Sequence, residues 1–337
     1  MSNPLLDVKD LVVQFKSSAA TVNAVNGVNF SLNKKETIGI VGESGSGKSV
    51  TATAIMRLIP SPPGKIADGQ IKFQDKDLVA LTDKEMRQVR GNEIAMIFQD
   101  PMTSLNPVFT VGNQIVEAIR THKDISKKDA KTEAIEMLKV VGIPEPTKRI
   151  DMYPHEFSGG MRQRVMIAIA LSCNPKLLIA DEPTTALDVT VQAQILELMK
   201  DLQEKNDTSI IMITHDLGVV WEMCDKVIVM YAGSTVESGT VEQIYANPKH
   251  PYTWGLLESQ ITSDIASEQE LQTIPGSPPD LRRPVPGCSF SSRCPFAKDI
   301  CHKEKPEVIE VEEGHRVSCH FQTKTNQLER KEGVFVE

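Results

Sequence analysis

The eight residues GESGSGKS, Gly42 to Ser49, constrain the fold more than any other stretch of this chain. They fit the pattern G-x-x-x-x-G-K-S and follow directly on TIGIV, residues 37–41, an apolar run of strand length. A helical pattern follows over residues 50–58, and PSPPG at 60–64 ends it. This order of strand, glycine-rich loop and helix predicts backbone N–H groups that converge on a phosphate at a helix start.

The polar side chains of this loop predict a purine nucleoside triphosphate with Mg²⁺ as the ligand. We expect Lys48 to reach the β- and γ-phosphate oxygens and the Ser49 hydroxyl to ligate Mg²⁺. A purely structural glycine loop is the alternative, and the flanking strand and helix argue against it. The loop residues expected to bind the nucleotide are Gly42, Ser44, Gly45, Ser46, Gly47, Lys48 and Ser49.

The segment KLLIADE, residues 176–182, supplies two carboxylates at the end of another apolar strand. Asp181 is expected to lie at the carboxyl edge of the sheet beside the glycine-rich loop, where it can hold the Mg²⁺ shell through water. Glu182 can accept the proton of an attacking water as a general base, while Lys48 and Mg²⁺ stabilise charge on the γ-phosphoryl oxygens. Solvated helix capping is the alternative for this acidic pair.

Apolar runs of strand length alternate with helical stretches along the chain, which favours an α/β sheet fold. After about Asn247 the composition becomes proline-rich and irregular, and residues 275–287 are expected to form a semi-extended linker. Further strands are expected at 209–215 and 226–233, and further helices at 111–141, 160–171 and 191–204.

Length and charge narrow the class of protein. A chain of 337 residues is long enough for roughly two domains, and its net charge of −8 argues against a nucleic-acid partner. No stretch reaches the roughly 18 to 20 uncharged apolar residues that span a bilayer, and the start MSNPLLDVKD lacks the pattern of a secretory signal. We therefore expect a cytoplasmic protein whose contact with a membrane runs through a partner.

The order of the motifs resembles the ATP-binding subunits of ABC transporters. The resemblance covers about residues 5–250 and implies a P-loop ABC ATPase cassette over 1–250, with a RecA-like sheet core and a helical subdomain at about 102–175. Residues 251–337 would form a short Pro/Cys-rich C-terminal extension. The motifs that carry the resemblance are GESGSGKS, Gln99 in IFQDP, FSGGMRQRV from Phe157, LLIADE, ALD at 186–188 and His215 in ITHD.

The resemblance also implies a role for FSGGMRQRV. In this family two cassettes pack head to tail, so that the glycine-rich helix start of one chain closes over the γ-phosphate held by the other. Phe157 and Met161 stand where leucine and glutamine are usual, and neither change removes a polar group that must touch phosphate. The residues implied to contact the neighbour's ATP are Ser158, Gly159, Gly160, Gln163 and Asp188.

Three more roles follow from the resemblance. Gln99 would contact Mg²⁺ and the attacking water, and His215 would contact the γ-phosphate and orient that water. Phe15 would stack on adenine. Structural readings remain open for two of them, because a lone histidine after a strand is often structural and Phe15 also suits a strand core.

The stretches FQDPMTSLNP and NPKHPYTWGLLES, with a tail that includes GHRVSCH, resemble the ATPase subunits of bacterial oligopeptide and dipeptide importers. This resemblance implies ATP-driven peptide import, with the chain on the cytoplasmic face of the cell membrane. The implied partners are two transmembrane permease subunits, a second homologous ATPase subunit forming a heterodimer, and an extracytoplasmic substrate-binding protein. A nickel or glutathione importer, a soluble ABC ATPase and a metal-bound interaction module are the alternatives.

Four of the six cysteines, Cys288, Cys294, Cys301 and Cys319, crowd into the C-terminal part with the spacing C-x5-C-x6-C-x17-C. Four thiolates are the ligand set of a [4Fe–4S] cluster and of a structural Zn²⁺ site. A short proline-rich tail is expected to have little apolar core, so a metal would supply the folding free energy that burial cannot. The Cys294–Pro295 step and the resemblance to the oligopeptide importers imply a [4Fe–4S] cluster, with Zn²⁺ or four free thiols as the alternatives.

Overall fold

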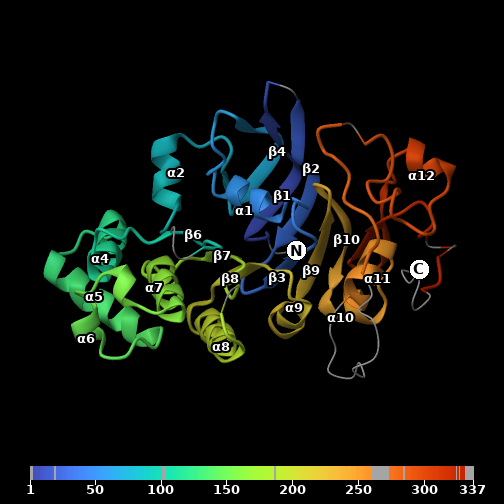
Figure 1. The fold of residues 1–337 in the computed structure, drawn as a ribbon. Helices are drawn as coiled ribbons and strands as arrows, with labels where there is room; N and C mark the ends of the chain where they lie inside the picture. The colour runs from blue at the N-terminus through green and yellow to red at the C-terminus, as the bar shows by residue number, and fades with distance from the viewer. Residues whose placement is uncertain are drawn as a thin grey trace. The chain divides into compact units, whose positions relative to one another are not determined.

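The computed structural model describes residues 3–18, 20–100, 104–185, 187–259, 273–283, 285–323, 325 and 327–330 (Figure 1). These residues form two compact units, each of which is described by itself. Among them, no helix combines the length and the apolar composition that crossing a membrane requires. The first unit draws on Met1–Leu5, Leu32–Thr37 and Ala80–Ile213, and the second on Leu6–Ser31, Ile38–Val79 and Thr214–Glu337.

The first unit contains three neighbouring parallel strands, β6 (Ile94–Ile97), β7 (Leu177–Asp181) and β8 (Ser209–Ile213). All residues of the three strands are buried. Continuous apolar runs of this kind are typical of parallel strands covered on both faces. In the register of β7 and β8, Asp181 pairs with Ile213, so β7 delivers this carboxylate to the carboxyl edge.

The helices α4, α5, α6 and α7 of the first unit group together (Figure 1). The structure divides the helix expected over 111–141 into two, because the chain is extended at Lys123 and Ser126 begins a new helix. The Ser126 hydroxyl accepts the N–H of Asp129, a typical N-cap contact. The helices described in this unit are α2 (Asp83–Val89), α4 (Val111–His122), α5 (Lys127–Val140), α6 (Pro146–Arg149), α7 (Gly159–Leu171) and α8 (Val189–Asn206), with a 3-10 helix at Pro154–Glu156.

The second unit contains an antiparallel sheet that the sequence patterns did not predict. Its strand order is β2-β1-β4-β5, where β1 is Leu6–Lys16, β2 is Thr21–Leu32, β4 is Gly64–Phe73 and β5 is Lys76–Asp77. Period-two alternation is broken in β1, because the register with β4 shifts between Lys9 and Val12. The PSPPG stretch therefore does more than end a helix, since its glycine begins β4.

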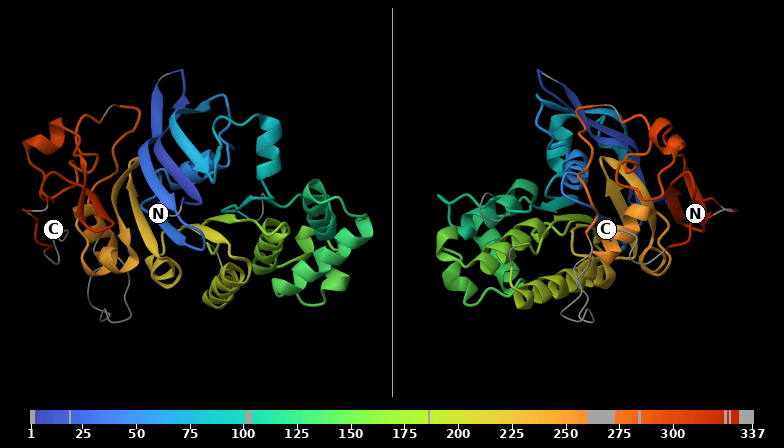
Figure 2. Two further views of the ribbon diagram at one scale, coloured as in Figure 1. Left: turned by 180° about the vertical axis from the view of Figure 1, so that it is seen from behind. Right: turned by 45° about the vertical axis from the view of Figure 1, so that its right-hand side comes forward.

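A second sheet region of this unit carries the glycine-rich loop. Strand β3 (Thr37–Val41) runs parallel to β9 (Lys226–Tyr231), and the order continues through β10 (Ser234–Thr240), β12 (His315–Ser318) and β11 (Val308–Glu312). The C-terminal strands, drawn in red, lie beside β10 (Figure 2). The described helices are α1 (Lys48–Ile55), α9 (Leu217–Met223), α10 (Val241–Ala246), α11 (Pro251–Glu258) and α12 (Asp299–Lys303).

The C-terminal segment has an apolar core, which corrects the expectation that its tail has little. Tyr252 and Phe290 are fully buried, and Trp254 is 1% exposed. The rings of Tyr231 and Tyr252 lie 4.6 Å apart, and that of Phe290 lies within 5.4 Å of both. Burial of these rings supplies folding free energy that the sequence pattern had assigned to a metal. These aromatic residues follow neither helical nor strand periodicity in the sequence, so the pattern of apolar residues does not predict this core.

A buried carboxylate ties β10 to the start of α11. Glu237 accepts the N–H groups of Lys249 and His250 at 2.6 and 2.8 Å, and its Oε1 lies 2.8 Å from His315 Nε2. His250 caps α11, because its Nδ1 accepts the N–H of Tyr252 at 3.0 Å. Burial lowers the pKa of His250 to about 4, and the Glu237 charge opposes this only in part. The cap therefore needs a neutral imidazole.

Mild acid is expected to destabilise the protein through His250. Its folded-state pKa of about 4 lies below the ordinary 6.5, so the unfolded chain binds this proton more tightly. Neutral His250 contributes fully to the free energy of unfolding above about pH 6.5. As the pH falls towards 4, that free energy decreases by up to about 3 kcal/mol. Urea unfolding between pH 7 and 4.5 measures it. His250→Asn keeps a capping acceptor that does not titrate, so it should lose less stability than wild type over this range; an equal loss would contradict the assignment.

Candidate functional site

The loop Gly42–Ser49 joins β3 to α1, as the sequence predicts. Its backbone takes a path that requires glycine, because positive φ angles disfavour residues with a Cβ. A Cβ on Gly42 would lie 2.1 Å from the carbonyl oxygen of Met230, and one on Gly47 would lie 2.5 Å from that of Ala24. The glycines with positive φ in this loop are Gly42 (147°), Gly45 (79°) and Gly47 (101°).

The side chains of the loop fit a phosphate ligand. Lys48 is 6% exposed, and its Nζ donates to the carbonyl oxygens of Gly42 at 2.7 Å and Glu43 at 3.1 Å. Ser46 is 3% exposed, and its Oγ has no hydrogen-bond partner among the described residues. A buried hydroxyl left without a partner costs about 1–3 kcal/mol, which a phosphate oxygen would offset. Ser49 is exposed in the first turn of α1, where its hydroxyl can reach a Mg²⁺ bound with the phosphates.

In the first unit, Glu182 is held in a strained backbone conformation with a φ of 48°. A residue other than glycine adopts this conformation at a cost of about 1 kcal/mol or more. Its Oε2 accepts Gln99 Nε2 at 3.0 Å and Thr185 Oγ1 at 2.9 Å, and its N–H donates to the carbonyl of Ile213. The structure thus joins two residues that the sequence analysis assigned to one reaction. Thr185 was missed, although a hydroxyl three residues after a candidate base could have signalled it.

The start of α7 presents the second glycine-rich stretch. Ser158 caps the helix by accepting the N–H of Met161, which leaves the hydroxyl proton of Ser158 unused in that bond. Ser158 and Gly159 are exposed, and a Cβ on Gly159 would meet open space. Asp188 is also exposed and caps α8 through the N–H of Val191. The helix start therefore offers N–H groups and a hydroxyl to a ligand from outside the unit.

Gln163 does not share this exposure. It is 3% exposed, and its Nε2 donates to the carbonyl oxygen of Pro183 at 2.5 Å. The side chain thus fixes the backbone next to Glu182. This burial is at odds with the expected contact to a neighbour's nucleotide, because the Gln163 amide already donates to a carbonyl within its own unit.

The other predicted site residues lie at or near the ends of strands and differ in their exposure. Asp181 is 5% exposed at the end of β7. In the second unit His215 is exposed just before α9, and Phe15 is half-buried at the end of β1 opposite Gly64. Ala186 of ALD and residues 101–103 of DPMTSLNP lie outside the described residues.

All four C-terminal cysteines line one cavity of about 20 Å³ together with apolar side chains. Burial raises the pKa of Cys294 to about 12 and that of Cys319 to about 11, so as free thiols they stay neutral. Across the described ranges, however, no group of three or more His, Cys, Asp or Glu side chains is arranged to hold a metal ion. The four predicted cysteines therefore gather in one place without forming a closed metal site.

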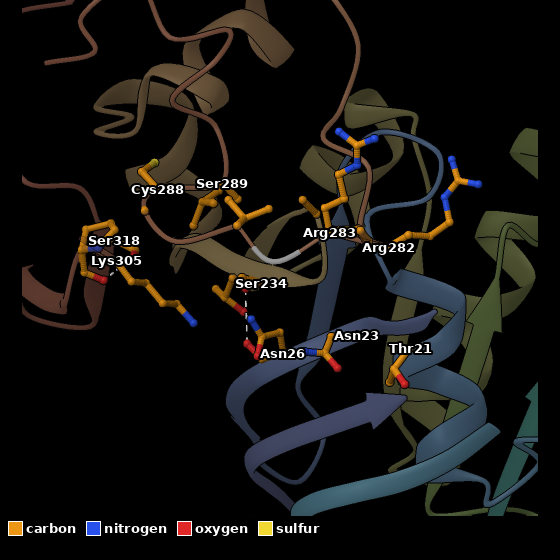
Figure 3. A pocket seen from close by; sticks show the side chains of 17 residues that line it. Thr21, Asn23, Asn26, Ser234, Arg282, Arg283, Cys288, Ser289, Lys305 and Ser318 are labelled. Atoms are coloured by element: carbon orange, nitrogen blue, oxygen red, sulfur yellow. Dashed lines mark hydrogen bonds between the residues drawn. The ribbon is translucent and has the colours of Figure 1, made fainter. Parts of the chain in front are cut away.

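A separate pocket of about 220 Å³ is lined by β2, β10 and the C-terminal segment (Figure 3). Lys305 lines it, and Arg282 and Arg283 direct their guanidinium groups away from Asn26 and Ser234 in this view. The three cations do not converge on one point, and we assign no ligand to this pocket.

Two regions of the chain match known families. Residues 25–185 match the family described as ABC transporter. Residues 236–301 match the family described as oligopeptide/dipeptide transporter, C-terminal region.

Curated relatives resemble the chain over nearly all of its length. The oligopeptide transport ATP-binding protein OppD of Bacillus subtilis (strain 168) is 61% identical over 93% of this chain and 87% of the relative. The dipeptide transport ATP-binding protein DppD of the same organism is 55% identical, over 94% of this chain and 95% of the relative. The OppD protein of Haemophilus influenzae is 54% identical, over 94% and 97% of the two chains.

Solved structures share the fold. The ATP-binding cassette MJ0796, solved as a dimer in a post-hydrolysis state with ADP and Pi, is 27% identical with a TM-score of 0.64. The match covers 70% of this chain and 98% of that one. A second dimeric structure of MJ0796, described as a bacterial ABC transporter cassette, has a TM-score of 0.63 at 27% identity, with the same coverage of both chains.

Gly42→Ala is expected to weaken binding of MgATP by the full-length chain by roughly tenfold or more, because the added Cβ would collide with the Met230 carbonyl. Equilibrium titration with MgATP measures the effect. Gly159→Ala is the control, since its Cβ meets open space and its expected contact is with a neighbour's nucleotide. Equal affinities of the two variants would contradict the fit of the loop to phosphate.

Proposed function

The chain belongs to the ABC transporter ATPases, as one of the ATP-binding subunits of oligopeptide and dipeptide transporters, and from this membership we propose the roles of its residues. It has the α/β fold of an ABC cassette and is an ATPase that powers the import of peptides. Import of nickel or glutathione is not favoured, because relatives at 54–61% identity bear peptide-transport names.

The glycine-rich loop binds ATP in this proposal. Its backbone N–H groups and Lys48 hold the β- and γ-phosphates, and the Ser46 hydroxyl gains the partner that it lacks. Phe15 stacks on the adenine ring. Ser49 and Gln99 would hold Mg²⁺, and Asp181 would act on its hydration shell; the metal would supply positive charge to the phosphates.

Glu182 is the general base, and the observation that carries this role is its hydrogen bond with Gln99. The Gln99 amide and the Thr185 hydroxyl both donate to Oε2, which orients the carboxylate and leaves Oε1 to accept a proton. Glu182 takes a proton from the attacking water, and His215 orients that water. The strained backbone at Glu182 supports the role, because such strain collects at functional positions.

Two cassettes pair head to tail in this proposal. Ser158, Gly159 and Gly160 of one chain contact the γ-phosphate bound by the other, and Asp188 couples the two sites. The exposed start of α7 and the likeness to dimeric cassettes support this arrangement. The second cassette is a related ATPase, and the pair works on the cytoplasmic face of the membrane with two permease subunits and an extracytoplasmic substrate-binding protein.

The four C-terminal cysteines carry a further proposal, that Cys288, Cys294, Cys301 and Cys319 hold a [4Fe–4S] cluster, with Zn²⁺ as the alternative. Their convergence on one apolar cavity supports it. Binding would remove their thiol protons, which burial otherwise makes difficult to lose. The cavity of about 20 Å³ has room for about one water, so the cysteine loops must open to admit a cluster. The role would be structural.

Glu182→Gln is expected to lower the rate of phosphate release by the assembled transporter roughly 100-fold or more, because glutamine cannot accept the proton of the attacking water. ATP affinity should stay near that of wild type, since the loop donors remain. Glu136→Gln is the matched control, because this glutamate is exposed on α5 and pairs only with Lys139 among the ion pairs described. Near-normal turnover of Glu182→Gln would refute the assignment.

The full-length chain purified without oxygen is expected to be brown and to contain about four iron and four sulfide per chain. Replacing Cys294 and Cys301 by serine should abolish the iron, whereas Cys224→Ser, at a buried cysteine outside the cavity, should retain it. Zinc at about one per chain would redirect the proposal to a structural zinc site. Absence of both metals would end it.

A further inference from the structure

Glu43, the second residue of GESGSGKS, is held at each of its polar groups. Its N–H donates to Tyr252 Oη at 2.8 Å. Its carbonyl oxygen accepts Lys48 Nζ and the N–H of Ser46, both at 3.1 Å. Its carboxylate accepts two bonds from Arg293, Nη1 to Oε2 at 2.7 Å and Nη2 to Oε1 at 3.1 Å. Two of these partners, Tyr252 and Arg293, belong to the C-terminal part of the second unit.

Arg293 is rigidly placed to make this contact. Its side chain is 5% exposed, compared with 27% for that of Glu43. Nε donates to the carbonyl of Pro275, Nη2 also donates to that of Ile274, and Nη1 lies 3.3 Å from Tyr231 Oη. A bidentate guanidinium with its remaining N–H groups bonded keeps a single geometry.

The charge of Glu43 poses a problem for the loop that Arg293 resolves. A carboxylate in a loop that binds a triphosphate repels the ligand, and the repulsion is strong where water is partly excluded. The two hydrogen bonds from Arg293 neutralise this carboxylate and draw it towards the C-terminal segment.

We propose that Arg293 is a positioning residue for ATP binding, which neutralises the Glu43 carboxylate and holds it towards the C-terminal segment. The C-terminal extension thereby forms part of the nucleotide site of its own chain. This inference rests on the proposed function, because it requires that Gly42–Ser49 bind ATP. If the contact between Arg293 and Glu43 were only structural, breaking it would lower stability, and removing the Glu43 charge would not restore ATP affinity.

Affinity of the full-length chain for MgATP, measured by equilibrium titration, tests the proposal. Arg293→Ala is expected to weaken binding roughly tenfold, because Glu43 then faces the phosphates unneutralised. Arg282→Ala is the matched control, since this arginine pairs with Asp280 at the surface of the same segment, and it should bind as wild type. Equal affinities of Arg293→Ala and Arg282→Ala would overturn the proposal.

Rescue separates the effect of charge from a loss of structure. Adding Glu43→Gln to Arg293→Ala removes the repulsion and should restore affinity to within about threefold of wild type. A double variant as weak as Arg293→Ala would contradict the role of charge. If Arg293→Ala does not fold, Glu43→Gln alone decides: it should bind MgATP at least as tightly as wild type, and a tenfold loss would overturn the proposal.

A wild-type control keeps the two claims distinct. Wild type should bind MgATP, and Lys48→Ala should not, because the loop then lacks its phosphate-binding ammonium group. Absence of MgATP binding by wild type would count against the proposed function itself. Binding by wild type that is unaffected by Arg293→Ala would count against this inference alone.

Discussion

The backbone path of Gly42–Ser49 is the constraint on which the rest of this site depends. Three glycines with positive φ allow the loop to turn tightly before α1. The turn is tight enough that a single added Cβ would meet the Met230 carbonyl at 2.1 Å. Lys48 Nζ donates to the carbonyl oxygen of Gly42 within the same loop. The buried Ser46 hydroxyl has no hydrogen-bond partner among the described residues.

The proposed general base, Glu182, is held by a different part of the fold. Glu182 follows a fully buried parallel strand, and its strained backbone is held by a hydrogen bond to Ile213. Gln99 and Thr185 fix the carboxylate, while the buried Gln163 fixes the neighbouring peptide. If Glu182 is the base, as proposed, these contacts mean that its carboxylate needs little reorganisation when the reaction begins.

The C-terminal segment is both a folded element and a neighbour of the phosphate loop. Its aromatic core is buried around Phe290, and Glu237 of β10 accepts the backbone N–H groups at the start of α11. Arg293 lies between Cys288 and Cys294 in the sequence, and its guanidinium donates to the Glu43 carboxylate. The backbone N–H of Cys288 donates to the carbonyl oxygen of Cys301 at 2.8 Å.

The sequence by itself determined the local parts: strand β3 with its loop, the apolar strands β7 to β9, helices α7 and α8, and the residues of the nucleotide motifs. These follow from periodicity and from glycine, serine and acidic residues at fixed spacing, all of which act within a few residues. Only the tertiary structure decided the pairing of β1 with β4, the burial of Gln163, the aromatic core around Phe290 and the contact of Arg293 with Glu43. Those depend on residues far apart in the chain, 250 positions for the last pair, and no local pattern encodes which distant side chain will satisfy a buried charge.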